Sequence, residues 1–383
     1  MIGLHEPFLS GNEWRYVKEC LDSGWVSSAG EFVERFEKAI VQYTGSQNAV
    51  ACVNGSAALQ VALRIAGITT DDEVIVPSLT FIAPVNAIHS NGAHPVFMDA
   101  DEYYNIDVDK TAEFLEKQTE LRDDGCWNLH SGRRIAAILV VHVFGNAARL
   151  EPLLELCEHY QLELIEDAAE SLGTVFSKGG LIGRQIGTIG KLGCLSFNGN
   201  KIVTAGGGGM ILTDDKELAE KARYLTTQAK DDPLRYIHHE DGYNFRLTNL
   251  QAALGVAQLE QLPVFLNRKQ NIFKKYKATL EEKEDLTLAE VPDYAHNNHW
   301  LNVLQIKDAT NGKRRDKLMR ILAERGIQTR PVWYLNHQQK MYKKCQNYRI
   351  EKAVCLVNKS LCLPSSANLT DENINHIINQ LNE

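Results

Sequence analysis

The chain has 383 residues, more than the roughly 250–300 that one hydrophobic core usually serves, so we expect a large domain and a smaller one. Hydrophobic residues make up 44% of the chain and charged residues 23%, and the formal net charge is −8. This acidic balance argues against nucleic acid or an anionic membrane as a partner, and it leaves room for a small anionic ligand at a local positive site.

The eight cysteines predict neither a disulfide framework nor a metal site, because they form no CxxC pair and no spacing typical of zinc ligands. Several lie in apolar runs, for example Cys52 and Cys194, so we expect buried free thiols in a reducing cytoplasm. Residues 1–14 lack the layout of a signal peptide, and no apolar run reaches the ~18 residues of a membrane span. The sequence therefore predicts a soluble, cytoplasmic protein.

Short apolar runs alternate with longer helical segments from residue 49 to residue 214. The apolar runs are AVACV (49–53), EVIVP (73–77), HPVFMDA (94–100), RIAAILVVHVFG (134–145), LELIED (162–167), GCLSF (193–197) and GMILTD (209–214). Val- and Ile-rich runs between helices are typical of buried, mostly parallel strands with crossover helices. The pattern predicts an α/β fold with a central, mostly parallel sheet, whose strand C-termini face the ligand cleft.

Helical periodicity dominates after the last of these runs. The apolar positions that predict a long amphipathic helix entering a second domain are Leu250, Leu254, Ala257, Leu259 and Leu262. The remainder, from about residue 265, mixes helices with short strands such as LNVLQI (301–306). The polar segment 116–134 is predicted to be a surface excursion.

The stretch SFNGNKIVTAGGGG (196–209) sets Lys201 before four consecutive glycines. A phosphate-binding loop of the GxxxxGK[ST] type has its glycines before the lysine, and Ser or Thr after it. Here the glycines follow Lys201, and Ile202 is its neighbour, so the phosphate-loop interpretation fails. A strand resumes at Gly209, which favours a tight turn or a close backbone approach over a disordered loop.

Three other positions follow predicted strand ends, and each allows two interpretations. Asp167 either caps the next helix or directs a carboxylate into the cleft toward a cationic ring nitrogen. Gly55, Ser56 and Ala57 start a helix, where backbone N–H groups and a hydroxyl can hold a phosphate, although many such junctions bind nothing. Phe81 either packs in the core or stacks on a planar ring.

Together with the amine of Lys201, these positions supply what pyridoxal phosphate (PLP) requires. The requirements are a lysine for a Schiff base, an acid that keeps the pyridine nitrogen protonated, and phosphate donors. The protonated ring accepts electrons from the substrate carbanion. No comparable set of residues in the sequence supports a metal site or a Ser-His-Asp triad.

A series of motifs runs along nearly the whole chain: FLSGNEWRYVKECLDSGWVSSAGEFVERFE, NGSAAL, PSLTF, HVFGNAA, EDAAES, SFNGNKIVTAGGGGM, GYNFRLTNLQAALG and QTRPVW. With this highly specific set the chain resembles the DegT/DnrJ/EryC1/StrS sugar aminotransferases, PLP enzymes of the aspartate-aminotransferase fold (fold type I). The resemblance implies a large PLP-binding domain over residues 31–260 and a small C-terminal α+β domain over residues 261–383. It also implies that residues 1–30 contribute to the active site.

The resemblance assigns roles to four residues around the cofactor ring. Lys201 would bind the cofactor covalently, Asp167 would pair with the pyridine nitrogen, and Phe81 would stack on the ring. Glu170 occupies the place near the ring hydroxyl where the family often has Gln or His.

The resemblance also assigns the phosphate contacts. They are Gly55, Ser56, Ala57 and Ser196 of the same chain, and Asn244 from the neighbouring subunit. A contact from a second subunit implies a homodimer with shared active sites. His142 matches a recurrent family position, and we expect it to be structural.

The resemblance implies transamination, because relatives that dehydrate the sugar carry histidine in place of Lys201. L-glutamate would donate an amino group to the cofactor, which would pass it to a nucleotide-linked keto-sugar, with Lys201 as the general base and acid. The motifs FNGNKI, GGGGM, YNIDVD and TRPVW look most like enzymes that make UDP-4-amino-4,6-dideoxy-N-acetyl-D-glucosamine from the UDP-linked 4-keto-6-deoxy sugar. Their products feed bacillosamine or legionaminic acid synthesis in bacterial surface polysaccharides.

Three alternatives stay open at this point. GDP-perosamine synthases share much of the same framework. A PLP-dependent dehydratase of the same fold, and a non-catalytic binding or regulatory protein that keeps the fold, are further possibilities. Substrate contacts are expected at Trp25, Arg330 and His337, and His299 and Trp300 are either core residues or substrate contacts.

Overall fold

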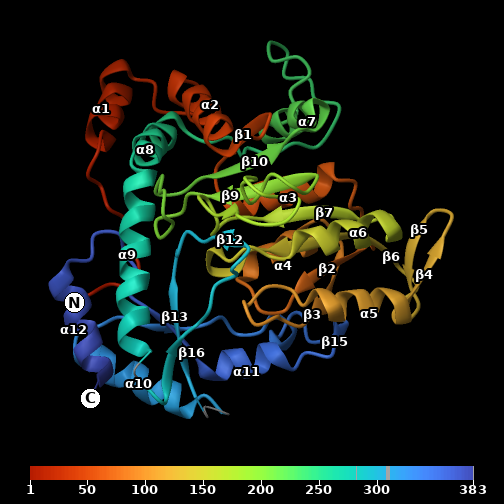
Figure 1. The fold of residues 1–383 in the computed structure, drawn as a ribbon. Helices are drawn as coiled ribbons and strands as arrows, with labels where there is room; N and C mark the ends of the chain where they lie inside the picture. Colours follow the sequence, from red (N-terminus) through yellow and green to blue (C-terminus); the bar gives the residue numbers. More distant parts are fainter. Residues whose placement is uncertain (282, 308–310, 383) are drawn as a thin grey trace.

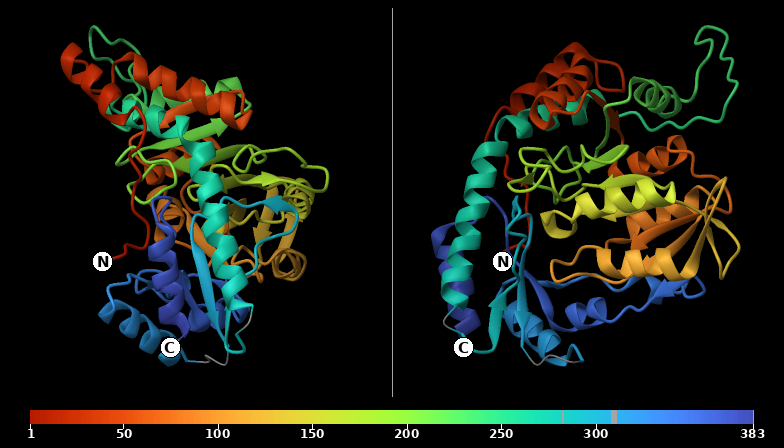
Figure 2. Two further views of the ribbon diagram at one scale, coloured as in Figure 1. Left: turned by 60° about the vertical axis from the view of Figure 1, so that its left-hand side comes forward. Right: turned by 45° about the vertical axis from the view of Figure 1, so that its right-hand side comes forward.

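The computed structural model describes residues 1–281, 283–307 and 311–382 (Figure 1). A large sheet flanked by helices forms one part, and a smaller antiparallel sheet with its own helices forms another. The long helix α9 (Leu262–Leu280) runs from the first toward the second, and both chain ends lie beside the smaller sheet (Figure 2).

The large sheet has the strand order β1-β10-β9-β7-β6-β2-β3-β15. These strands are β1 (Asn48–Cys52), β10 (Gly209–Thr213), β9 (Leu192–Ser196), β7 (Glu163–Asp167), β6 (Arg134–Val141), β2 (Glu73–Pro77), β3 (His94–Met98) and β15 (Asn347–Tyr348). Pairing is parallel from β9 through β7, β6, β2 and β3 to β15, and antiparallel at β1–β10 and β10–β9. The predicted α/β fold is confirmed, and the sheet is mixed, with a parallel centre.

Helices bury both faces of this sheet, which explains why its strands read as continuous apolar runs. In β2, Val74 and Val76 pack into one cluster with α3 (Gly55–Ile65), α4 (Ile82–Ser90) and α7 (Lys216–Thr226). Ile75 points the other way, into a cluster that includes residues of α2 (Glu31–Thr44), α5 (Val108–Gln118) and α6 (Leu150–Tyr160). The period-2 alternation of a strand thus separates two cores.

Helices α1 (Glu13–Ser23) and α8 (Asn249–Glu260) lie at one end of the large sheet (Figure 1). The predicted long amphipathic helix is two helices, because α8 ends at Glu260 and α9 starts at Leu262 with Pro263 in its first turn, where proline is tolerated. Moreover, α8 is buried nearly all round rather than on one face.

The polar segment 116–134, predicted to be a surface excursion, has secondary structure of its own. It forms the hairpin β4 (Thr119–Arg122) and β5 (Gly125–Asn128), and β5 continues the sheet by pairing with β6. Its polar composition reflects a strand pair at the margin of the molecule, where one side faces solvent.

The smaller sheet has the order β11-β13-β16-β14 and is antiparallel. Its elements are β11 (Leu286–Leu288), β13 (Asn302–Ile306), α10 (Lys313–Glu324), β14 (Arg330–Pro331), η2 (Asn336–Gln338), α11 (Lys352–Lys359), β16 (Ser360–Leu363) and α12 (Asp371–Asn382). A separate core joins α9, this sheet and α12 through residues such as Tyr276, Leu304 and Ile377. A short pair, β8 (Val175–Phe176) with β12 (Ala295–His296), links the two parts.

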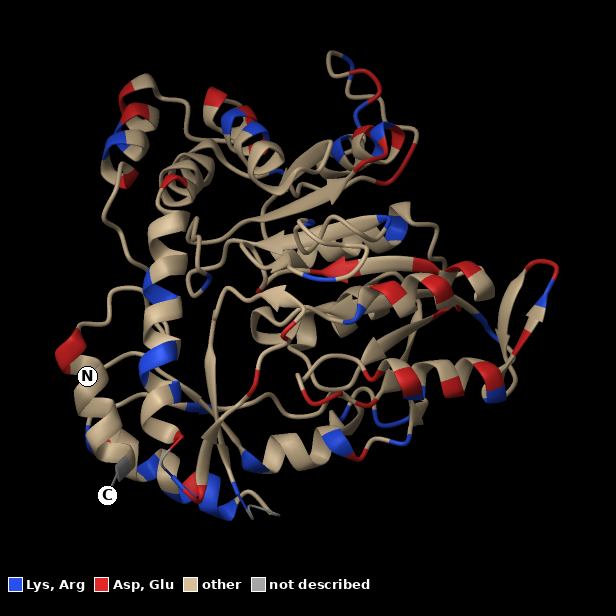
Figure 3. Ribbon diagram, viewed as in Figure 1, with Lys and Arg blue, Asp and Glu red and all other residues tan. Residues whose placement is uncertain are grey.

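The predicted division at residues 30 and 260 remains a prediction. Ile2 pairs with Ile327, and β15 returns to the edge of the large sheet, so both ends of the chain cross between the two parts. Basic residues lie on α9 and α10 and acidic residues on α5 and α6, without one continuous basic face in this view (Figure 3). Within residues 1–281, 283–307 and 311–382, no helix has the length and apolar composition of a membrane span.

Candidate active site

The carboxyl ends of β7 and β9, the segment after β2 and the N-terminus of α3 enclose a cavity of about 310 Å³. Parallel strands direct their C-terminal residues to one edge of the sheet, so groups far apart in sequence meet there. Of the residues predicted from the sequence, the structure brings these to the cavity: Gly55, Ser56, Phe81, Asp167, Glu170, Ser196 and Lys201.

Lys201 lies in the turn after β9, and its side chain is mostly buried. Its Nζ is 3.5 Å from Glu170 Oε1 and 4.0 Å from the centre of the Trp300 ring. Its backbone N–H donates to Asn198 O at 2.9 Å, which fixes the turn. The amine is therefore held between a carboxyl group and an aromatic face.

Glu170 is buried and holds two of its neighbours at once. Its Oε2 accepts the Phe144 N–H at 2.8 Å, and its Oε1 faces Lys201. Burial raises the pKa of Glu170 to about 7, against the opposing effects of the Lys201 charge and the Phe144 amide. This carboxyl group therefore changes charge near neutral pH.

Asp167 ends β7 and is 4% exposed. Its Oδ1 accepts the Ala169 N–H at 3.0 Å, so it makes a local turn contact as well as lining the cavity. Burial raises the pKa of Asp167, while the Ala169 amide and the Lys201 charge oppose that rise. A cation beside this carboxylate, such as a protonated ring nitrogen, would stabilise its charged form.

A buried pair lies next to Asp167. His142 Nε2 is 3.0 Å from Glu166 Oε2, and His142 Nδ1 accepts the Ala148 N–H at 3.1 Å, which places the ring proton on Nε2. Glu166 also accepts the N–H groups of Gly187, Ile189 and Gly190. Burial raises the pKa of Glu166, but His142 and these amides outweigh burial and leave the pKa below its ordinary value. The contacts agree with the structural role expected for His142.

The turn that follows β6 presents the Phe144 amide to Glu170. Residues Val143–Gly145 form the 3-10 helix η1, and Phe144 has φ 59°, a conformation that a bulky residue adopts only when its surroundings enforce it. The Phe144 ring stacks on Trp333, with centroids 4.8 Å apart.

The N-terminus of α3 forms the polar end of the cavity. A Cβ at Gly55 would lie 3.0 Å from Ser196 Cβ, so glycine allows this helix to approach β9 closely. Asn54 caps α3, and its Oδ1 accepts the Ala57 N–H at 2.8 Å. The predicted Ala57 is thus buried with its amide hydrogen engaged, whereas Gly55 and Ser56 line the cavity.

Aromatic side chains form the opposite wall. Phe81 is 54% exposed in this chain and meets Trp333 edge to face, with centroids 6.3 Å apart. Trp300 and Trp333 complete the wall. Phe81 therefore borders the cavity and is not a core residue.

The remaining predicted residues lie outside this cavity lining. Asn244 and Trp25 are exposed, and Arg330 is exposed with Nη1 donating to Thr329 O at 3.1 Å. His337 Nδ1 is 2.6 Å from Ser78 Oγ, behind the segment that carries Phe81. Burial lowers the pKa of His337.

Sequence reasoning assigned no site role to several lining residues: Asn54, Thr80, Asn198, Asn200 and Trp333. It left Trp300 open between a core residue and a substrate contact, and the structure places Trp300 in the cavity lining. Trp333 falls within the motif QTRPVW, which pointed to the region without giving it a role. Asn336 also received no role from the sequence, and it lies outside the cavity lining. Its Nδ2 donates to the carbonyls of Ser78 and Thr80 and so fixes the segment before Phe81. Trp300, Trp333 and Asn336 come from the C-terminal part, where no strand-end pattern marks them.

Known proteins share both the sequence and the fold. The sequence model of the DegT/DnrJ/EryC1/StrS aminotransferase family matches residues 8–382. EpsN of Bacillus subtilis (strain 168), named as a pyridoxal phosphate-dependent aminotransferase, is 35% identical over 99% of this chain and 95% of its own length. The GDP-perosamine synthase of Escherichia coli O157:H7 is 36% identical over 100% of this chain and 98% of its own.

A solved structure gives the same result. The aminotransferase TlmJ from Streptoalloteichus hindustanus superposes with a TM-score of 0.87 at 27% identity, covering 100% of this chain and 98% of TlmJ.

Proposed function

Because the chain belongs to the DegT/DnrJ/EryC1/StrS aminotransferase family and is a PLP-dependent sugar aminotransferase, we propose that it transfers the amino group of L-glutamate to C4 of a UDP-linked 4-keto-6-deoxy-N-acetylhexosamine. The product would be UDP-4-amino-4,6-dideoxy-N-acetyl-D-glucosamine, for bacterial polysaccharide synthesis. The observation that carries this proposal is the meeting of the Lys201 amine with two buried carboxyl groups, Asp167 and Glu170, in one cavity.

The donor set of the cavity fits PLP. It combines a primary amine, a buried carboxylate, an aromatic wall and a helix N-terminus, which match an aldehyde, a pyridine nitrogen, a planar ring and a phosphate. Lys201, Asp167 and Phe81 would hold the ring end, with Glu170 beside it. Gly55, Ser56 and Ser196 would hold the phosphate. PLP, when bound, supplies the electron sink that the carbon–hydrogen bond cleavage requires.

The chain's own residues then move the proton. Lys201 Nζ is the basic group in the cavity. It would take the proton from the substrate-derived carbon and deliver it to C4′ of the cofactor. Asp167 would keep the ring nitrogen protonated, and its burial excludes water that would weaken this pairing. Trp300 covers Lys201 and limits access of solvent to the amine.

The first test is the covalent attachment of PLP to Lys201. Purified protein mixed with PLP should show a visible absorption band, and Lys201→Ala should abolish it. Lys201→Arg keeps the positive charge without an amine that can react, so it should also lack the band. A wild-type protein without the band would overturn the proposed function.

The choice of sugar rests on the motifs FNGNKI, YNIDVD and TRPVW. A GDP-linked 4-keto-6-deoxy sugar is the second candidate, favoured by the name of the Escherichia coli relative. The two candidate substrates can be distinguished by experiment. The enzyme is incubated with L-glutamate and either the UDP- or the GDP-linked keto-sugar, and mass spectrometry identifies the aminated product. Amination of the GDP-linked sugar alone would contradict the UDP proposal, and loss of the C3 hydroxyl would favour a dehydratase.

A homodimer with shared active sites is part of the proposal. Lys201 is the only basic side chain among the described residues that line the cavity, so a diphosphate would need further donors. Asn244 from the neighbouring subunit and the exposed Arg330 are our candidates, and Trp25 and His337 remain proposed substrate contacts. The free cysteines, most of them buried, fit a reducing compartment such as the cytoplasm.

A further inference from the structure

Trp300 contacts the reactive nitrogen of the site. Lys201 Nζ lies over its indole ring, 4.0 Å from the centroid, well inside the ~6 Å range of a cation–π interaction. Tryptophan is the strongest of the aromatic partners, and the attraction grows when both groups are removed from water. Trp300 is 3% exposed, so this pair is largely desolvated.

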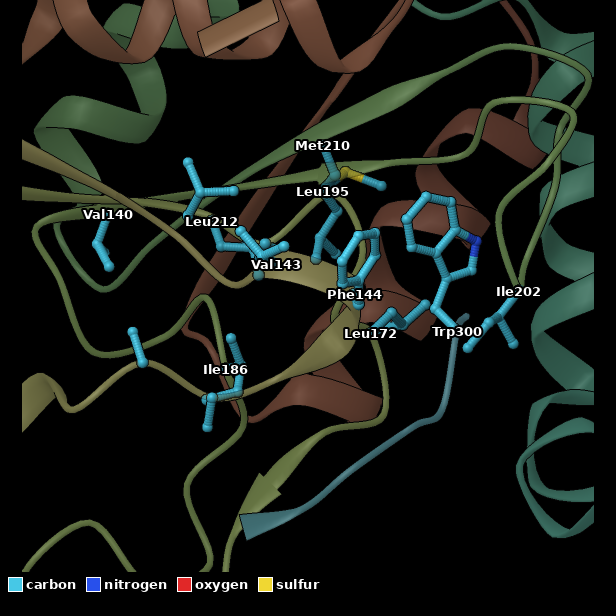
Figure 4. Close-up of a cluster of buried hydrophobic side chains, with 14 of the residues drawn as sticks. Val140, Val143, Phe144, Leu172, Ile186, Leu195, Ile202, Met210, Leu212 and Trp300 are labelled. Carbon is cyan, nitrogen blue, oxygen red and sulfur yellow. The ribbon is translucent and has the colours of Figure 1, made fainter. Parts of the chain in front are cut away.

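Three hydrogen bonds fix the ring in this position. Its Nε1 donates to Asn200 O at 2.8 Å, and its backbone N–H donates to Asn298 Oδ1 at 3.0 Å. Its carbonyl accepts from Lys269 Nζ at 3.1 Å. Figure 4 shows the indole between Phe144 and Ile202, and the Phe144 ring is stacked at 6.4 Å. The indole is thus positioned without any ligand.

Lys269 secures Trp300 from α9. It is 1% exposed, and its Nζ also contacts Ser365 O and His5 Nε2, both at 2.7 Å. A lysine this buried is held by its partners, because an unsatisfied amine there would be costly. The N-terminal segment and the segment after β16 therefore meet at the Lys269 amine, which α9 holds against the carbonyl of Trp300.

We propose that Trp300 is a catalytic residue whose ring holds the ammonium form of Lys201 between the step in which Nζ takes the substrate proton and the step in which Nζ returns it. This inference rests on the proposed role of Lys201. Transamination leaves Nζ free for part of each turnover, and once Nζ has taken the proton it must keep that proton and stay near the reacting carbon. The indole face favours the charged nitrogen over the neutral one, and Glu170 limits how far it moves.

The charged and titratable groups around Lys201 and Trp300 come from several elements. Asp167 ends β7 and Glu170 follows it, His5 belongs to the N-terminal segment, and Lys269 contacts the Trp300 carbonyl from α9. The experiment therefore changes the ring alone and leaves these groups in place.

The test uses the cofactor-free protein and follows the growth of the PLP absorption band across a range of pH. Trp300→Leu should raise the fraction of neutral, reactive amine. The rate of attachment at pH 7 should rise by roughly 3- to 10-fold, and its pH midpoint should fall. Trp300→Phe keeps an aromatic ring with a weaker cation–π attraction and is the safer variant for folding. Its attachment rate and its pH midpoint should lie between those of wild type and Trp300→Leu. Trp127→Leu is the matched control, because it removes an indole that lies outside the cavity lining, on β5, with the Arg122 guanidinium 4.9 Å from its ring centre. The pH midpoint of this variant should equal that of wild type.

The outcomes separate this inference from the proposed function. No band in the wild-type protein would contradict the role of Lys201 itself. A normal wild-type band with an unchanged midpoint in both Trp300 variants would overturn the inference alone. The same holds if the variants change only the KM for the nucleotide sugar, since the ring would then be a substrate contact.

Discussion

Two carboxyl groups in the cavity have pKa values that depend on their charged neighbours. The positive charge of Lys201 opposes the rise that burial causes in the pKa of both Asp167 and Glu170. The charge of Asp167 raises the pKa of Glu170 further. Replacing Asp167 therefore changes the pH response of Glu170.

Replacing Glu170 should change how stability depends on pH. Its pKa is about 7 in the folded chain and ordinarily 4.5, so the folded chain binds more protons between these values. Stability of the cofactor-free protein should therefore fall as pH rises through this range, by up to about 3 kcal/mol from this group. Glu170→Gln should remove that part of the slope, as measured by urea unfolding at a series of pH values.

Glu158→Gln is the matched control for this measurement, because Glu158 is exposed on α6. It should leave the slope of stability against pH unchanged. Equal slopes in wild type and Glu170→Gln would show that Glu170 does not titrate in this range.

Replacing Asp167 tests the second carboxyl group. Asp167→Asn keeps the shape of the side chain and its contact with the Ala169 amide, but it removes the charge that would hold a ring proton. We expect kcat to fall by about 100-fold or more, as for other buried electrostatic groups at reacting centres. The absorption band of attached PLP should persist, and unchanged turnover would contradict the role of Asp167 in holding the ring proton.

At the level of elements, the turn after β6 determines the position of two site residues. Gly145 has φ 89°, and a Cβ there would clash with Asn298 Oδ1 at 1.9 Å. Asn298 Nδ2 donates to the carbonyls of Glu170 and Leu172, while its Oδ1 accepts the Trp300 amide. One asparagine therefore connects the segment of Glu170 with that of Trp300, and Gly145 provides the space for it.

Gly145→Ala should disturb this connection. Gly132 offers a matched control, because its φ is 69° but no atom lies within 4 Å of the place that an added methyl group would occupy. Gly132→Ala should cost about 1–2 kcal/mol of backbone strain. Gly145→Ala should cost ~3 kcal/mol or more, because strain and a clash add. Urea unfolding of both variants measures the difference, and equal losses would exclude the clash with Asn298.

The strand-end residues were predictable from sequence, because the apolar run before Asp167 and the strand–helix junction at Ser56 are local patterns. The reversed direction of β10 was not predictable, since a buried strand has the same pattern in either direction. Trp333 was not assigned and Trp300 was left open between core and substrate contact, because both reach the cavity from the C-terminal part through turns without periodicity. The burial of α8 on nearly all sides depends on α1 and α2, which its own sequence does not show.

At the scale of the whole molecule, the two parts share the site. Trp300 and Trp333 come from the C-terminal part, and Lys201, Asp167 and Phe81 come from the large sheet and its connections. The N-terminal segment joins them through His5 and through the pairing of Ile2 with Ile327. A change in the angle between the two parts would therefore alter the aromatic wall of the cavity.

The proposed homodimer leads to a prediction about mixed subunits. Asn244 is exposed and lies outside the cavity of its own chain, as a residue that serves the neighbouring subunit would. Lys201→Ala lacks the amine, and Asn244→Asp places a negative charge against the phosphate, so each variant alone should be inactive. Unfolding and refolding the two together should form mixed dimers with one intact site each, and activity should return to about a quarter of wild type.

As a control, either variant refolded with the Lys201→Ala/Asn244→Asp double variant should stay inactive. If the mixture of single variants also stays inactive while sedimentation shows dimers, each active site would have to be complete within one chain.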